Sequence, residues 1–379
     1  MMNLQDGIAS GQPADARRRR DLVKALLLSI HRQLASISSP QKIRLMEVCG
    51  THTMSIFKHG LRHLLPDRIE LISGPGCPVC VTSPGQIDAA IKLSDIPDLI
   101  VATFGDMLRV PGSQGQSLAK ARARGADVRI VYSPVDALQL ARDNPDRNVC
   151  FLGIGFETTA PVVAATLKMA SQLSVNNFFV YSCHKTMPNA LEALFSSKES
   201  DVQGLLCPGH VSAIIGEQPY GFLVEKYGLA CAITGFEAEE ILLGVLSLLK
   251  QLASKYPFVD NCYPRAVSPE GNPSAVAALE QVFQPSTAVW RGLGSIPGSG
   301  LAIRQQFKRH DAESHFGIEI EEPNKVSGCR CHRIITGQII PPECPMFRKA
   351  CTPENPMGPC MVSSEGACAA WFKYGGERL

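Results

Sequence analysis

The sequence is poor in aromatic residues and almost neutral, and both properties limit the partners that it can have. Phe, Trp and Tyr make up 6% of the 379 residues, and the formal net charge is +2 at pH 7. Proteins that bind nucleic acids usually present a basic surface, often with aromatic rings that stack on the bases. We therefore expect no nucleic acid partner.

Long hydrophobic runs are missing as well. No apolar stretch reaches the 18 residues expected of a transmembrane helix. The apolar run at residues 22–30 follows four arginines, but Lys24 interrupts it and no A-x-A cleavage site follows. An amphipathic surface helix explains this run better than a secretory signal, with one apolar face formed by Leu22, Ala25, Leu26 and Ile30. We expect a cytoplasmic protein with no membrane contact.

Cysteine, in contrast, is abundant. The chain has 14 cysteines. In a reducing compartment, clustered cysteines indicate metal binding or redox chemistry more than structural disulfides. A chain of this length also exceeds a typical single hydrophobic core, so two or three domains are expected.

Short apolar runs alternate with helical stretches over the first two thirds of the chain, which predicts βαβ units and parallel sheets. We expect strands at residues 44–48, 70–72, 98–103, 128–132, 148–154, 177–182, 204–207 and 230–234. Four strands in each half predict two similar α/β lobes. The expected domains are an N-terminal extension with a helix at 1–40, lobe 1 at 41–145, lobe 2 at 146–257 and a C-terminal domain at 258–379.

Sulfur and polar side chains recur where the predicted strands end. Ligands of open parallel sheets bind at this carboxyl edge. Any single Gly, Thr or Pro there is best explained as a turn or helix cap. Repeated cysteine and histidine are harder to explain in this way, so we expect a common cleft. Its weaker candidates, each of which can also be a satisfied polar residue, are Glu157, His184 and His210.

Cys49 is followed by Thr51 and His52 in a Cys-Gly-Thr-His motif. A lone cysteine at a strand end is more often part of the core. Here the neighbouring hydroxyl and imidazole can donate hydrogen bonds or accept a proton, which would activate a thiolate as a nucleophile or soft metal ligand. The parallel order of the strands predicts that Cys49 lies beside Cys77 and Cys80, giving a three-thiol site.

Cys77 and Cys80 form a C-x2-C motif with an internal proline, placed between a strand and a helix. This arrangement makes a reversible dithiol/disulfide pair feasible and lowers a thiol pKa through the helix N-terminal amides. A zinc half-site is the competing interpretation, but no matching second knuckle is present.

The segment from residue 329 to the end is rich in proline and contains six cysteines: Cys329, Cys331, Cys344, Cys351, Cys360 and Cys368. Structural zinc sites and non-ligand thiols are alternatives, but zinc sites usually show paired knuckles, which are missing here. Long unequal spacings favour a [4Fe-4S] cluster held from separate loops. The predicted fold class is therefore α/β, with two similar parallel-sheet βαβ lobes and a smaller irregular C-terminal iron–sulfur domain. Spacing alone does not choose four ligands from six.

Four long motifs resemble the HypD family of maturation factors for [NiFe]-hydrogenases. They are Met-Glu-Val-Cys-Gly-Thr-His-Thr from Met46, Ser-Gly-Pro-Gly-Cys-Pro-Val-Cys-Val-Thr from Ser73, Gly-Phe-Glu-Thr-Thr-Ala-Pro from Gly155 and Gly-Pro-Cys-Met-Val-Ser-Ser-Glu-Gly-Ala-Cys from Gly358. The resemblance covers residues 42–374. It implies a scaffold that, with a HypC-type chaperone and a HypE-type cyanide donor, builds the Fe(CN)2CO group.

The same resemblance implies roles for individual residues. Cys49 would be the iron ligand shared with HypC, and Cys77 and Cys80 would line the same cleft. Thr51, His52 and Glu157 complete the expected catalytic set. The family's cluster pattern, C-x14-C-x6-C-x16-C, selects Cys329, Cys344, Cys351 and Cys368. Such a chain is an assembly scaffold with redox or ligand-transfer activity rather than a conventional turnover enzyme.

Two other functions fit the residues. A [4Fe-4S]-dependent thiol/disulfide oxidoreductase would show multiple turnovers and hold no iron beyond its cluster. A non-catalytic scaffold would tolerate substitution of Cys77 and Cys80. The glycine-rich segment at Gly74 lacks the Gly-Lys-Ser/Thr ending of a P-loop, so we expect any nucleotide-dependent step to belong to a partner.

Overall fold

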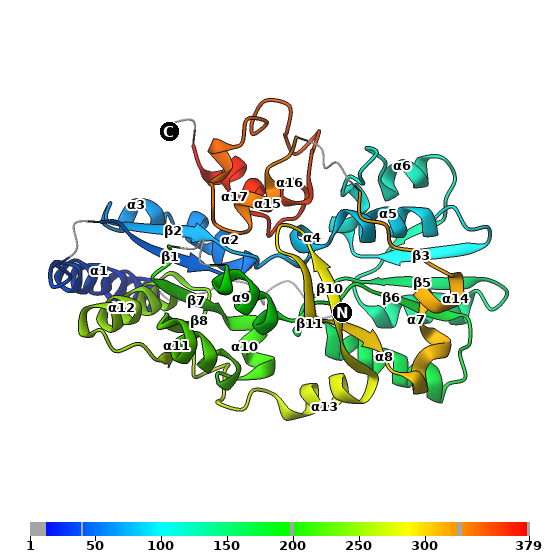
Figure 1. Ribbon diagram of the computed structural model, residues 1–379, viewed down its shortest axis with the longest axis horizontal. Coiled ribbons are helices and arrows are strands. Elements are labelled where there is room, and N and C mark those ends of the chain that lie inside the picture. The colour runs from blue at the N-terminus through cyan, green and yellow to red at the C-terminus, as the bar shows by residue number, and fades with distance from the viewer. Residues whose placement is uncertain (1–12, 39–40, 198–200, 324–327, 377–379) are drawn as a thin grey trace, which may run out of the picture.

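The computed structural model describes residues 13–38, 41–197, 201–323 and 328–376. Two parallel β-sheets flanked by helices lie side by side, a two-stranded hairpin lies between them, and the C-terminal segment lies above β1, β2 and α4 (Figure 1). The predicted α/β class, with two parallel-sheet lobes and a small irregular C-terminal region, is confirmed.

Sheet A has five parallel strands in the order β2-β1-β7-β8-β9. Its strands are β1 (Ile43–Glu47), β2 (Ile69–Ser73), β7 (Gly204–Pro208), β8 (Ala230–Thr234) and β9 (Val259–Asn261). Every residue of β7 and β8 is buried, as expected of central parallel strands that helices cover on both faces.

Sheet C has four parallel strands in the order β4-β3-β5-β6. They are β3 (Leu99–Thr103), β4 (Val128–Ile130), β5 (Asn148–Gly153) and β6 (Phe178–Ser182). All eight predicted strands are therefore present, most of them displaced by a residue or two at the ends. The short edge strand β9 was not predicted.

The two sheets are not built from consecutive halves of the chain. Strands β1 and β2 pair with β7, β8 and β9, whereas β3 to β6 form the other sheet. The chain thus leaves sheet A after β2 and returns to it at β7. This membership differs from the predicted lobes at 41–145 and 146–257. The reason is that a continuous apolar run indicates a buried strand but carries no information about its partner.

Helices fill the connections between strands. Those up to the hairpin are α1 (Pro13–Ala35), α2 (Gly50–Lys58), α3 (Leu61–Leu64), α4 (Pro78–Val81), α5 (Pro84–Leu93), η1 (Gly105–Arg109), α6 (Leu118–Ala123), α7 (Pro134–Asp143), α8 (Ala160–Gln172), α9 (Met187–Ser196), α10 (Gly209–Ile215), η2 (Gln218–Tyr220), α11 (Gly221–Tyr227), α12 (Ala238–Ser254) and α13 (Pro273–Val282). The side chains of Ser83 and Ser133 cap α5 and α7, each followed by a proline at the first helical position.

The N-terminal helix α1 packs against α12. Leu26 and Ile30 are buried as predicted, together with Leu34, whereas Leu22 is 47% exposed. Ala25, also predicted on the apolar face, is exposed. The buried residues Leu26, Ile30 and Leu34 follow an i, i+4 spacing. The buried face of α1 therefore starts at Leu26, later than the sequence predicted.

The hairpin of β10 (Phe283–Trp290) and β11 (Gly294–Ile303) holds the carboxyl ends of both sheets. The backbone N–H of Arg291, at its turn, donates to the carbonyl of Val81 at the end of α4 (2.8 Å). The N–H of Thr186, which follows β6, donates to the carbonyl of Ser299 on β11 (2.9 Å). A regular hairpin therefore lies within the region 258–379, which the sequence predicted to be irregular.

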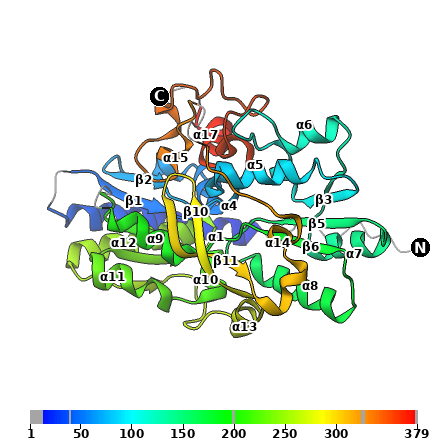
Figure 2. The ribbon, with the colours of Figure 1, turned by 45° about the vertical axis from the view of Figure 1, so that its right-hand side comes forward.

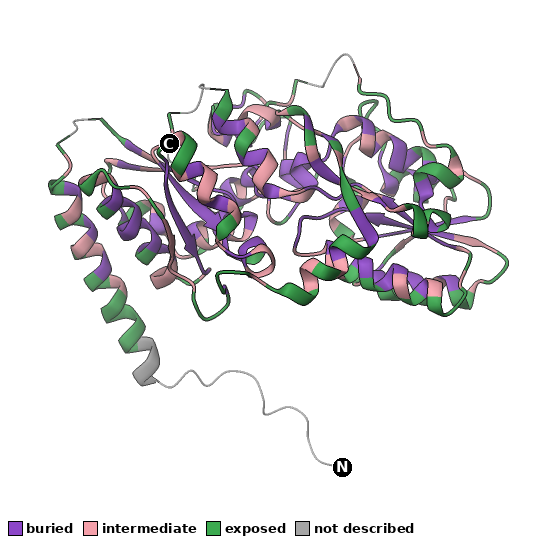
Figure 3. Ribbon diagram, turned by 60° about the horizontal axis from the view of Figure 1, so that its bottom comes forward, coloured by how far each residue is buried: buried purple, intermediate pink, exposed green. Residues whose placement is uncertain are grey.

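The remaining elements are short: η3 (Gln305–His310), α14 (Ala312–Phe316), α15 (Cys331–Ile334), η4 (Pro341–Glu343), α16 (Pro359–Val362) and α17 (Ala367–Tyr374). Figure 2 shows α15 and α17 stacked beside α4 and α5. Figure 3 shows the strands of both sheets buried inside their helices. None of the described helices is both long and apolar enough to cross a membrane.

Candidate thiol site and cysteine cluster

Cys49 lies where β1 ends and α2 begins. It is the N-cap residue of α2, has an extended backbone and is 8% exposed. Burial, and then the negative charge of Glu365, raises the pKa of its thiol to about 11. The thiol is therefore protonated at neutral pH, and a bound metal ion would have to displace that proton.

Glu365 joins the C-terminal segment to the Cys49 loop. The Thr51 hydroxyl donates a 2.7 Å hydrogen bond to its carboxylate. A Cβ atom at Gly50 would lie 2.4 Å from the Cβ of Glu365, so only glycine permits this approach. Glu365 lies within the motif that starts at Gly358, but no role for this residue was predicted from the sequence.

His52 and His210 both pack on the ring of Phe236, with ring centroids 4.7 Å and 4.0 Å away. The three residues follow β1, β7 and β8, so adjacent strands of sheet A bring them together. The Nδ1 atom of His210 lies 4.0 Å from the Sγ atom of Cys49. Because His210 is exposed, it connects the buried thiol to solvent.

The His52 ring is held by the backbone. Its Nε2 atom lies 2.9 Å from the carbonyl oxygen of Gly235 and 3.2 Å from that of Thr234. Carbonyls only accept, so Nε2 carries the hydrogen. Burial lowers the pKa of His52 to about 4, and the ring is neutral at pH 7. Its buried Nδ1 has no partner among the described residues and can accept but not donate.

Cys77 and Cys80 are joined by a disulfide, with their Cα atoms 5.2 Å apart. Cys77 is the N-cap of α4, and Pro78 occupies the first helical position. The N–H of Gly50 donates to the carbonyl of Gly76 (3.1 Å). This bond places the disulfide-bearing loop directly against the Cys49 loop.

The six C-terminal cysteines gather in one region. Neighbouring thiols in the series Cys329, Cys331, Cys360 and Cys368 shift one another's pKa, so the four lie close together. Cys329 and Cys344 both raise the pKa of Cys351, after burial. All four residues of the expected ligand set thus belong to the same group of thiols.

The surroundings of these thiols suit thiolate ligands. The N–H of Met357 donates to Cys351 Sγ (3.4 Å). A Cβ atom at Gly358 would lie 2.6 Å from Cys329 Sγ, so this glycine leaves room for the sulfur. Of the six cysteines, only Cys329 is partly exposed, and the others are buried. A buried set of thiols with a backbone N–H donor fits an iron–sulfur cluster.

In the parts of the chain that the structure describes, no three His, Cys, Asp or Glu side chains surround a point where a single metal ion could be held. A four-iron cluster keeps its thiolates farther apart than a single ion does. The fit to a cluster therefore rests on the buried set of thiols and on the backbone N–H that donates to Cys351. Iron at Cys49, Cys77 and Cys80 stays a prediction.

Glu157 and His184 lie at the carboxyl edge of sheet C instead. The Glu157 carboxylate accepts from the N–H of Met187 (2.8 Å), and burial raises its pKa to about 7. The Ser182 hydroxyl donates to the carbonyl of Leu301 and lies 3.0 Å from Nδ1 of His184, from which it can accept. Oε2 of Glu157 and Nε2 of His184 are buried without a partner among the described residues, and a functional role for either residue stays a prediction.

The edges of the two sheets nevertheless approach each other at Tyr220. Burial raises the pKa of this phenol first, followed by the charges of Cys207, Glu157 and Cys49. The phenol is thus within electrostatic reach of Cys49 and of Glu157. The Ser212 hydroxyl lies 3.1 Å from the phenol oxygen. Nothing in the sequence motifs pointed to Tyr220.

Glu47 was also missed, although an acidic residue inside an apolar strand was visible in the sequence. Its buried carboxylate accepts from the hydroxyls of Ser73 (2.7 Å) and Thr53 (2.9 Å). Arg62 lies 3.9 Å away, and its guanidinium stacks over Trp371 of α17. Burial raises the pKa of Glu47 to about 7, opposed by Arg62. This chain of contacts fixes the C-terminal segment on β1.

Comparison with known proteins gives one consistent class, the factors that mature hydrogenases. The family model HypD, described as "Hydrogenase formation hypA family", matches residues 21–375. Hydrogenase maturation factor HypD of Rhodobacter capsulatus is 44% identical over 364 residues, covering 94% of this chain and 96% of that protein. Hydrogenase maturation factor HypD of Escherichia coli K12 is 44% identical over 340 residues, covering 89% and 91%. A putative hydrogenase expression/formation protein of Methanocaldococcus jannaschii is 41% identical over 355 residues, covering 94% and 98%.

The chain belongs to the HypD family of hydrogenase maturation factors. The family that the four sequence motifs indicated is therefore confirmed.

Proposed function

We propose that this chain is the scaffold and redox centre on which the Fe(CN)2CO group of [NiFe]-hydrogenases is assembled, together with a HypC-type chaperone and a HypE-type cyanide donor in the cytoplasm. The observation that carries the proposal is the meeting of three sulfur groups. The Cys49 loop, the Cys77–Cys80 disulfide and the C-terminal cysteines lie against one another.

Cys49 is the proposed site of the iron that is being assembled. Its buried thiol lies beside the exposed His210, so a partner protein can approach it from that side. A pKa of about 11 keeps the free thiol unreactive, and iron binding would release its proton. His210, whose Nδ1 is 4.0 Å from the sulfur, is placed to take that proton.

The sequence predicted that Thr51 and His52 donate hydrogen bonds or accept a proton beside the Cys49 thiol. Their hydrogens are already donated, from Thr51 to Glu365 and from Nε2 of His52 to backbone carbonyls. We propose that they position the loop instead. The free acceptor at His52 Nδ1 suits a donor or a metal but not a cyanide nitrogen.

The C-terminal cysteines are proposed to hold a [4Fe-4S] cluster through Cys329, Cys344, Cys351 and Cys368. A bound cluster would supply single electrons beside the disulfide. The contact that supports this role is the packing of α16, which carries Cys360, against α4, which carries Cys80. Reduction would open the disulfide and make Cys77 and Cys80 available as thiols next to Cys49.

The test is to purify the protein without oxygen, with and without a co-expressed HypC-type chaperone, and to measure iron, acid-labile sulfide and the infrared spectrum. We expect about four irons per chain from the cluster, plus further iron with cyanide and CO bands that the substitution Cys49→Ala removes. Cluster iron with a silent infrared spectrum, even with the chaperone present, would favour the thiol/disulfide oxidoreductase.

A further inference from the structure

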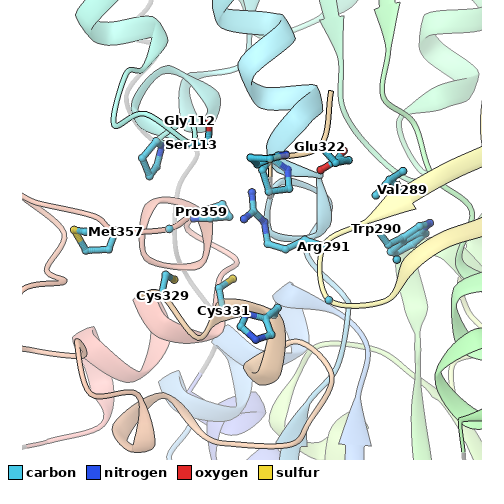
Figure 4. A pocket seen from close by; sticks show the side chains of 17 residues that line it. Gly112, Ser113, Val289, Trp290, Arg291, Glu322, Cys329, Cys331, Met357 and Pro359 are labelled. Atoms are coloured by element: carbon cyan, nitrogen blue, oxygen red, sulfur yellow. The ribbon is translucent and has the colours of Figure 1, made fainter. Parts of the chain in front are cut away.

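A cavity of about 350 Å³ lies beside the C-terminal cysteines. Its walls come from the hairpin turn, the start of α5, the loop before α6 and the cysteine-bearing segment, and they include Trp290, Arg291, Cys329, Cys331, Met357 and Pro359. Figure 4 shows the Arg291 side chain lying between Cys331 and Glu322. The lining is mainly apolar, with a charged rim.

This cavity is the place where the cysteine cluster comes nearest to solvent. Cys329 is the one partly exposed thiol of the six, and it lines the cavity. Electron transfer between proteins weakens steeply with distance. A redox partner must therefore approach the side on which Cys329 lies.

The rim is basic. Arg291 lines the cavity, and Arg330 lies between Cys329 and Cys331, which line it as well. Both guanidinium groups act on His332, another lining residue, and lower the pKa of its imidazole after burial. Within the described ranges neither arginine forms an ion pair with an acidic side chain. Arg330 is exposed. The acidic residue on the opposite wall, Glu322, accepts from the N–H of Gly85 (3.3 Å).

Arg291 also connects this face to the disulfide. Its Nε atom donates to the carbonyl of Thr82 (3.2 Å), and its backbone N–H donates to the carbonyl of Val81, which follows Cys80 directly. Its positive charge acts on Cys329 and Cys331. Arg291 thus contacts the segment that carries the Cys77–Cys80 disulfide and faces the partly exposed thiol of Cys329.

We infer that this cavity and its arginine rim are the docking surface for a small acidic one-electron carrier protein, an inference that rests on the redox role proposed above. Redox encounters use small interfaces, and opposite charges steer them. The apolar cavity would receive a side chain of the carrier, and the arginines would pair with its carboxylates. Two carriers, each losing one electron, together with two protons would convert the Cys77–Cys80 disulfide into two thiols.

The test uses the full-length protein, purified without oxygen, and a reduced acidic [2Fe-2S] ferredoxin as the probe. Arg330→Glu is compared with Arg330→Gln and with Arg18→Glu, an exposed arginine on the distant helix α1. Calorimetric titration measures binding of the probe, and stopped-flow absorbance measures electron transfer. Iron and sulfide contents show whether each variant is loaded.

We expect Arg330→Glu to weaken binding and slow reduction on the order of tenfold, Arg330→Gln to act in between, and Arg18→Glu to change little. Added salt should slow electron transfer from the ferredoxin to the unsubstituted protein and have less effect on transfer to the Arg330→Glu variant. Equal effects of the substitutions at Arg18 and Arg330, or equal binding of the basic carrier cytochrome c, would overturn the inference. Protein without iron and sulfide would contradict the proposed cluster instead, and calorimetry would still decide the docking surface.

Discussion

The carboxyl edges of the two sheets carry similar residues but differ in their surroundings. At sheet A, Cys49 lies beside an exposed histidine, and the C-terminal segment reaches it through Glu365. At sheet C, Glu157 and His184 are 4% and 2% exposed, and the hairpin covers the adjoining segment. Strand-end chemistry alone therefore does not make a reactive site. What covers the edge decides whether a partner can reach it.

Lys185 illustrates the covered edge. It is 1% exposed, and its ammonium donates to the side chain of Gln86 (2.9 Å) and to the carbonyl of Val289 on β10 (3.0 Å). Burial lowers its pKa to about 8. A buried lysine in a cleft can indicate catalysis, but here both hydrogen-bond partners of the ammonium belong to α5 and the hairpin. The Lys185 ammonium thus links the segment after β6 to α5 and to the hairpin.

The largest effect is expected at Cys49. Cys49→Ser should reduce hydrogenase maturation to background, because a hydroxyl does not replace a thiolate as a soft iron ligand. Cluster absorbance should persist, since Cys49 lies outside the group of six cysteines. Loss of the cluster together with maturation would show that the two sites are not separate.

At the carboxyl edge of sheet C, which the hairpin covers, we expect substitutions to lower stability rather than activity. Lys185→Ala removes two buried hydrogen bonds and leaves a cavity, which should lower the free energy of unfolding by about 2–4 kcal/mol. Urea denaturation provides the measurement. Lys250→Ala, at an exposed position of α12, should change it by less than about 0.5 kcal/mol. If Lys185→Ala abolished maturation at unchanged stability, both edges would be functional.

The next prediction concerns pH. The folded-state pKa of Glu157 is raised from 4.5 to about 7, so between these values the folded state binds more protons than the unfolded state. Stability from this residue is present at low pH and is lost as pH rises through 7, by at most about 3 kcal/mol. Glu157→Gln should flatten the pH dependence of unfolding between pH 5 and 7. An exposed control, Glu354→Gln, should leave it unchanged.

The smallest effect is expected in the pKa of the Cys49 thiol. Glu365 raises the pKa of Cys49 less than burial does, so Glu365→Gln should lower this pKa while leaving it above that of a free thiol. The alkylation rate of Cys49 against pH, followed by mass spectrometry of its peptide, measures the shift. A pKa that rose or did not change would mean that the carboxylate does not act on the thiol.

Much of this protein is determined locally by its sequence. The apolar runs at 148–154 and 230–234 form strands because a parallel strand that helices cover on both faces needs a mostly apolar segment. Helices begin at Ser83 and Ser133 because a hydroxyl followed by proline satisfies the first turn. The positions of Cys49 and Cys77 between a strand and a helix were also readable, because each follows an apolar run within a few residues.

Only the tertiary structure decided which strands share a sheet and which side chains meet. β1 pairs with β7 across more than 150 residues of chain, and no local pattern encodes that choice. The contacts of Cys49 with His210 and of Thr51 with Glu365 join segments that are far apart in sequence. Such contacts depend on how sheets, hairpin and C-terminal segment pack together, and packing is a property of the whole chain.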